Sequence, residues 1–242
     1  MDKQLLGEFM GTLVLVLLGN GTVANVLLGK TKGQNSGWIV ITTGYFLAVM
    51  AGVAVAQACG SPGAHINPAV TLAAALVKGD FSNVAGFWAA QLLGALVGAV
   101  AVWLHFLPHW AETPDRGLKL ACFSTGPAIR NAGANLISEI IGTFLLFLII
   151  AAIVSKGVSG GAPAPGTAPY LVGAVVWAIG MGLGGTTGFA INPARDLGPR
   201  IAHAILPIPG KGGSDWGYAM IPVAGGLIGG GLAGVFVKMV GF

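Results

Sequence analysis

The feature that most constrains this chain is the tripeptide Asn-Pro-Ala, which follows a glycine-containing turn in each half of the sequence. An asparagine side chain can accept a hydrogen bond from a free amide of the first helical turn. Proline suits the first helical position, because the N–H that it lacks would have no partner there. Both copies therefore predict a helix start, at Asn67, Pro68 and Ala69 and at Asn192, Pro193 and Ala194.

Both of the helices that begin in this way are short. The first is predicted over residues 67–78 and the second over residues 192–205. A membrane span needs about 20 residues, and both short helices lie between longer apolar segments. Broken backbone at membrane depth is tolerated only where it lines a cavity or is buried in protein. The pattern therefore predicts a pore or a transport site.

The composition places the chain in a membrane. Hydrophobic residues make up 55% of the sequence and charged residues 8%, whereas soluble domains carry about 25% charged residues. We predict a multi-pass integral membrane protein whose first apolar segment is retained, since Glu8 interrupts it and no cleavage site follows. The net charge is +4, but its cations are scattered singly, so we predict no nucleic-acid partner.

The two halves of the chain repeat each other. The sequence Glu-x-x-Gly-Thr occurs at residues 8–12 and 139–143, and glycines with equal spacing follow in the last segment of each half. Three full spans in each half is an odd number, so the second half must be inverted relative to the first, an arrangement that places a site at the bilayer midplane. The apolar segments cover residues 5–28, 38–58, 84–107, 136–154, 170–183 and 218–240.

The predicted fold is an all-α membrane protein with six transmembrane helices and two re-entrant half-helices in an inverted 3+3 repeat. Residues 1–242 form one domain. The first repeat covers residues 1–107, a linking loop covers 108–134, and the second repeat covers 135–242.

These paired motifs resemble the major intrinsic proteins, the aquaporin and glycerol-facilitator family. Asp196, directly after Asn-Pro-Ala-Arg, resembles the aquaglyceroporin branch. The resemblance implies a pore in which Asn67 and Asn192 offer side-chain amides to a passing oxygen atom. It also implies a homotetramer in the cell (inner) membrane with cytoplasmic termini, although the loops that would then face outward hold more Lys and Arg than those facing inward.

The resemblance also implies a narrow selectivity filter. Arg195 takes its arginine position, Phe189 its aromatic position and Gly180 its small position. Matching Tyr45 to the fourth position requires an insertion before the first Asn-Pro-Ala, and an ungapped count gives Leu47 instead.

The charged residues of the apolar segments admit different roles. A charge at membrane depth is costly and usually functional, so Arg195 is predicted to bind solute and repel cations. Asp196 is predicted to be structural, in the first turn of its helix. Glu8 and Glu139 either accept hydrogen bonds from loop amides or relay protons. The resemblance implies that His65 lines the pore through its backbone, and the alternative role is gating by titration of its ring.

The expected function is a passive channel for glycerol and other small uncharged solutes, together with water, that excludes ions and protons. The same pore could instead suit urea, lactic acid, a metalloid hydroxide or mainly water. A different class, an ion-coupled secondary transporter, also uses inverted repeats. No phosphate loop, nucleophile–base pair or metal cluster is recognisable in the sequence, so we predict no enzyme, no cofactor and no metal.

Overall fold

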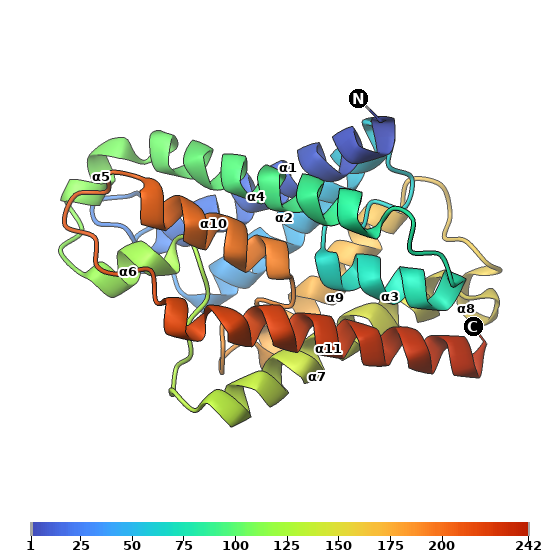
Figure 1. Cartoon of the computed structure of the whole chain (residues 1–242). Helices are drawn as coiled ribbons and strands as arrows, with labels where there is room; N and C mark the ends of the chain where they lie inside the picture. The colour runs from blue at the N-terminus through green and yellow to red at the C-terminus, as the bar shows by residue number, and fades with distance from the viewer. Residues whose placement is uncertain (1, 242) are drawn as a thin grey trace.

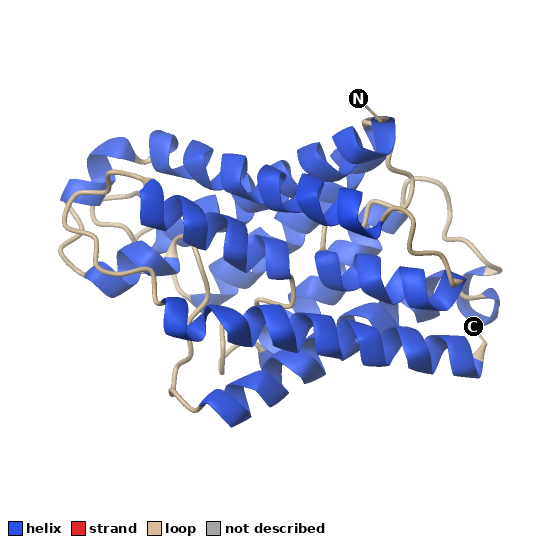
Figure 2. Cartoon of the chain, viewed as in Figure 1, coloured by secondary structure: helices blue, strands red, loops and turns tan. Residues whose placement is uncertain are grey.

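The computed structural model describes residues 2–241, and every regular element in that range is a helix (Figure 2). Five helices are long and apolar enough to cross a membrane. They are α1 (Lys3–Leu27), α2 (Trp38–Ala58), α4 (Val84–His105), α7 (Ala132–Val154) and α11 (Trp216–Val240).

The sixth predicted span is shorter than the others. α9 (Ala168–Leu183) has 16 residues, so it is about 24 Å long. Pro169 lies at its start, and Gly184 and Gly185 follow its end, so the sequence itself limits the helix. The two half-helices are α3 (Pro68–Lys78) and α10 (Pro193–Ile205).

Three further helices are short and were not expected. α5 (Leu107–Ala111) begins at the boundary of the predicted linking loop, α6 (Arg116–Ala121) lies within that loop, and α8 (Lys156–Ser159) follows α7. Asp115 caps α6, because its carboxylate accepts hydrogen bonds from the amides of Gly117 and Leu118 at 2.6 and 3.1 Å. Such a cap is a readable signal for a helix start, but a helix of six residues carries little apolar periodicity.

The two halves of the chain interlock through their half-helices. α3 packs against α11 of the second half, and α10 packs against α4 of the first. The two half-helices lie one after the other along the bundle, and both chain termini lie at the same end (Figure 1). Small residues permit the contact, since a Cβ on Gly230 of α11 would lie 2.6 Å from the carbonyl oxygen of Ala69.

The repeated glycine spacing marks a second close approach in each half. A Cβ on Gly94 would lie 2.3 Å from the carbonyl oxygen of Phe9, so α4 meets α1 backbone to backbone. A Cβ on Gly229 would lie 2.4 Å from the carbonyl oxygen of Ile140, so α11 meets α7 in the same way. Close packing through small residues replaces the hydrophobic driving force that is weak between helices in lipid.

Candidate functional site

The two asparagines of the repeated motif lie at the junction of the half-helices. Asn67 accepts a hydrogen bond from the amide of Ala69 at 2.9 Å, and Asn192 accepts from the amides of Ala194 and Arg195 at 3.1 and 3.2 Å. Each side chain therefore caps its own helix. A side-chain amide has two N–H groups, and one from each asparagine binds the opposite half. Asn67 donates to the carbonyl of Ile191, and Asn192 to that of residue 66, at 2.8 and 2.9 Å.

The backbone before each half-helix is strained in the same way. Ala64 and Ile66 have φ angles of 40° and 44°, and Phe189 and Ile191 both have 41°. Positive φ is unfavourable for a β-branched residue and persists only where the surroundings hold it. The matching angles make the two loops structural copies of one another.

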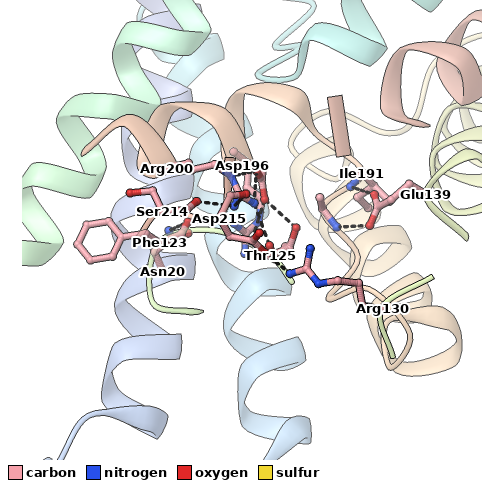
Figure 3. A network of polar contacts seen from close by, with 12 residues as sticks. Asn20, Phe123, Thr125, Arg130, Glu139, Ile191, Asp196, Arg200, Ser214 and Asp215 are labelled. Atoms are coloured by element: carbon pink, nitrogen blue, oxygen red, sulfur yellow. Dashed lines mark hydrogen bonds and ion pairs between the residues drawn. The ribbon is translucent and has the colours of Figure 1, made fainter. Parts of the chain in front are cut away.

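Two buried carboxylates hold these strained loops. Glu8 accepts hydrogen bonds from the amides of His65 and Ile66 at 2.8 and 2.6 Å. Glu139 accepts from the amides of residues 190 and 191 at 3.1 and 2.9 Å, and its contact with Ile191 is drawn in Figure 3. Both carboxylates are occupied by backbone, so their geometry is that of a loop support.

Three cavities follow one another along the junction. The first has a volume of about 280 Å³ and includes Leu15, Val49, Val53, Asn67 and Asn192 in its wall. A constriction of about 40 Å³ adjoins it and shares both asparagines. The third has about 260 Å³ and shares Tyr45, Phe189 and Arg195 with the constriction. Because successive cavities share wall residues, they lie in series past both asparagines, and we call this series the path.

The narrow part of this path has an aromatic wall and a cationic wall. The rings of Tyr45 and Phe189 meet edge to face, with centroids 5.5 Å apart. The guanidinium carbon of Arg195 lies 4.9 Å from the centre of the Tyr45 ring, and its Nη2 donates to the Tyr45 hydroxyl. Leu47 is 47% exposed on the outside of the helix bundle, so the structure brings Tyr45, and not Leu47, to this point.

Gly180 lies behind the narrow part. A Cβ at this position would be 3.0 Å from Cζ of Phe189 and 3.1 Å from Cγ2 of Thr42. The space that the missing side chain leaves is thus filled by the Phe189 ring. The absence of a side chain at Gly180 therefore lets the Phe189 ring pack directly against α9.

Asp196 follows Arg195 in the chain, but its carboxylate pairs with another arginine. Asp196 forms a buried ion pair with Arg200 at 2.8 Å, one helical turn away, and accepts two hydrogen bonds from Thr125 at 2.7 Å (Figure 3). Arg200 also donates to the carbonyls of Ser214 and Asp215 at 2.9 and 3.1 Å. This pair ties α10 to the segments that precede α7 and α11.

The comparisons with known proteins agree with this geometry. A family model described as "Major intrinsic protein" matches residues 1–237. The chain belongs to the major intrinsic protein family. It is a multi-pass integral membrane channel, and the prediction of an all-helical fold of this type is confirmed, as is the expectation that it is not an enzyme.

Relatives of this major intrinsic protein cover nearly the whole chain. A probable glycerol uptake facilitator protein of Thermotoga maritima is 56% identical over 227 residues, which are 93% of this chain and 94% of the relative. The glycerol uptake facilitator protein of Bacillus subtilis is 52% identical over 95% of this chain and 82% of the relative's length. The X-ray structure of the aquaglyceroporin from Plasmodium falciparum superposes with a TM-score of 0.85, at 29% identity, over 98% of this chain and 96% of its own.

Other side chains of this major intrinsic protein support the path without having been predicted. Trp38 donates from its ring nitrogen to the carbonyl of Gly180 at 3.1 Å and meets Phe189 edge to face. Its position at the first residue of an apolar segment is a signal for an interfacial tryptophan. His65, which the sequence did single out, lies in the wall of the first cavity, and its Nδ1 is 3.2 Å from the hydroxyl of Thr71.

Proposed function

We propose that this channel carries glycerol and similar short polyols passively across the membrane, together with water. The observation that carries the proposal is the narrow part of the path, where Arg195 faces the rings of Tyr45 and Phe189. A guanidinium has five N–H donors, and the two bonds to Tyr45 and Phe123 leave three for solute. The hydroxyl oxygens of glycerol can accept hydrogen bonds from those donors, and its carbon atoms can pack against the two aromatic rings. The names of the Thermotoga maritima and Bacillus subtilis relatives support the same solute.

The same geometry supports the exclusion of ions and protons. Both half-helices begin at the asparagines, and each helix N-terminus carries roughly half a positive charge. Cations therefore meet an unfavourable field at the junction and a second one at Arg195. The side-chain N–H groups of the asparagines bind the oxygen of a passing water and thereby orient that water. This orientation interrupts the chain of hydrogen-bonded waters along which protons would move.

Flux into proteoliposomes tests the proposal. We expect glycerol entry that rises linearly with concentration and does not change when a protonophore collapses the pH gradient. Fast water flux with glycerol entry at the rate of empty liposomes would contradict the glycerol assignment. Uptake that stops with the protonophore would instead support a coupled transporter.

Lactic acid is a second candidate solute. The D/L-lactic acid transporter of Lactiplantibacillus plantarum is 41% identical over 91% of this chain and 90% of its own. Neutral lactic acid has a hydroxyl and a carbonyl oxygen next to each other, which suit the free donors of Arg195. A swelling panel of glycerol, urea and lactic acid at low pH would rank the solutes.

We also propose the arrangement that the family resemblance implies for the assembly. It consists of two inverted repeats, 1–107 and 135–242, joined by 108–134, in a homotetramer with both termini in the cytoplasm and with one pore in each subunit. The matching loops around Ile66 and Ile191 support the repeat. A reporter fused after the C-terminus tests the orientation, and native mass spectrometry tests the tetramer.

A further inference from the structure

A buried polar residue of α1 lies directly behind the narrow part of the path. Asn20 is 1% exposed, and its carbonyl oxygen accepts a hydrogen bond from the Tyr45 hydroxyl at 2.8 Å. Its side-chain nitrogen donates to the backbone carbonyl of Phe123 at 2.7 Å, and the two residues are seen together in Figure 3. Asn20 lies behind Tyr45, which forms the wall of the path together with Arg195.

These contacts close a ring of four hydrogen bonds. Arg195 donates from Nη1 to the Phe123 carbonyl at 3.3 Å and from Nη2 to the Tyr45 hydroxyl. Arginine can only donate, so the hydroxyl proton of Tyr45 must point to Asn20. A carbonyl can only accept, so the nitrogen of Asn20 must face Phe123. Each position in the ring therefore has one permitted orientation.

The backbone of α1 also seats the Tyr45 ring. A Cβ on Gly19 would lie 2.5 Å from Cε1 of Tyr45, so the ring rests directly on the helix at that position. The neighbouring residue is Asn20, which then meets the hydroxyl. Two consecutive residues of α1 thus fix both the plane of the ring and the direction of its O–H bond.

We propose that Asn20 is a specificity-determining positioning residue, which acts on solute through Tyr45 and Phe123. The inference rests on the proposed function for its solute class, a short polyol. The ring uses the Tyr45 proton and both lone pairs of the Phe123 carbonyl. What remains for solute is mainly the N–H groups of Arg195, held at a fixed spacing. The filter therefore favours solutes with neighbouring oxygen acceptors over water, whose single oxygen atom cannot occupy several spaced donors at once.

Loss of Asn20 would undo this arrangement. The Tyr45 hydroxyl would have to find another acceptor, and the path is the space that it adjoins. The Phe123 carbonyl would regain a free lone pair. Arg195 would keep its two bonds, but to partners that are no longer fixed.

A double-mutant cycle tests the proposal. The variants are Asn20→Leu, which keeps the approximate volume, Tyr45→Phe, which removes only the hydroxyl, and the double variant. We expect each single variant to lower the ratio of glycerol to water permeability by about five- to tenfold, the equivalent of one net hydrogen bond. The double variant should lie within about twofold of either single one, because both remove the same unit.

The matched control is Thr22→Val on the same helix. Its hydroxyl donates to the carbonyl of Leu18, at 2.9 Å, within α1. Thr22→Val should leave the ratio of glycerol to water permeability unchanged. A change in this control would mean that any loosening of α1 alters the ratio, and not the loss of the bonds to Asn20 in particular. If Asn20→Leu does not assemble, Asn20→Ser takes its place in the same cycle.

Two results would overturn the proposal. One is a wild-type ratio in the Asn20 variant, and the other is a double variant whose loss equals the product of the single losses. If the wild-type protein carries water and no glycerol, the proposed function is wrong, but the role of Asn20 is still testable. The same double-mutant cycle is then measured on water permeability. Effects of the Asn20 and Tyr45 variants that multiply in the double variant would overturn the role of Asn20.

Discussion

Asn67 and Asn192 meet at the centre of the molecule without bonding to each other. Each donates instead to the carbonyl just before the other, at 2.8 and 2.9 Å. Each also caps its own half-helix. The asparagines therefore join the two halves of the chain, and these bonds use one of the two side-chain N–H groups of each.

Replacing one of these amides with a carboxylate should weaken ion exclusion. Asn67→Asp keeps an acceptor for the cap but cannot donate to the carbonyl of Ile191 when ionised. The new charge offsets the positive ends of both half-helices, so we expect proton or cation leakage to rise at least about tenfold. A pH-sensitive dye inside proteoliposomes measures it.

Asn131→Asp is the matched control for that variant. Asn131 also caps a helix, α7, by accepting from the amide of Ala134 at 3.1 Å, and it lies away from the path. Its substitution should not change leakage. Equal leakage in the two variants would contradict a special role for the central asparagine.

Glu8 is expected to matter for stability and not for proton coupling. Its carboxylate accepts hydrogen bonds from the Ser61 hydroxyl at 2.6 Å and the Gln91 amide at 2.8 Å, besides the two loop amides. Glu8→Gln places an N–H against these donors, and we expect unfolding to become easier by about 2–4 kcal/mol. Thermal unfolding in detergent measures the change. Normal stability combined with a new dependence of flux on the pH gradient would favour a proton relay.

The sequence revealed the parts of the structure that depend on neighbouring residues. The caps at Asn67 and Asn192 lie within three residues of their partners, and helix chemistry alone predicts them. The two-fold repeat of the Glu-x-x-Gly-Thr motif indicated that Glu8 and Glu139 have one shared role, and both hold loop amides.

Contacts between residues far apart in the chain could not be predicted from local sequence patterns. Asn20 and Phe123 are 103 positions apart, and Tyr45 and Arg195 are 150 apart. Only the packing of α1, α2, α10 and the segment that follows α6 brings them together, and no local pattern encodes it. Arg200 was missed for another reason. Its four-residue spacing from Asp196 predicts an ion pair on one helix face, but such pairs usually lie on the protein surface and have no role in a site.

The buried pair of Asp196 and Arg200 should be essential for folding. Both side chains are fully buried, and Asp196→Asn leaves the guanidinium charge without its counter-ion. Removing one partner of a buried pair costs about 3–5 kcal/mol, so we expect a large drop in Tm and in yield. The control is Lys30→Ala, which breaks the exposed pair with Glu112 and should leave Tm unchanged. Similar Tm values for the two variants would show that the buried pair is dispensable.

A methyl group at Gly180 should narrow the path from behind. The new Cβ would lie 3.0 Å from Cζ of Phe189, so the ring must shift away from α9. One carbon atom in a close-fitting site changes discrimination by about tenfold or more. For Gly180→Ala we therefore expect glycerol flux to fall about tenfold and water flux, which needs less width, to fall less than about threefold. Gly182→Ala is the control on the same helix, because its Cβ would meet nothing within 4 Å. Stopped-flow light scattering gives both fluxes, and a proportional loss of glycerol and water in the Gly180 variant would mean that Phe189 does not set the width of the filter.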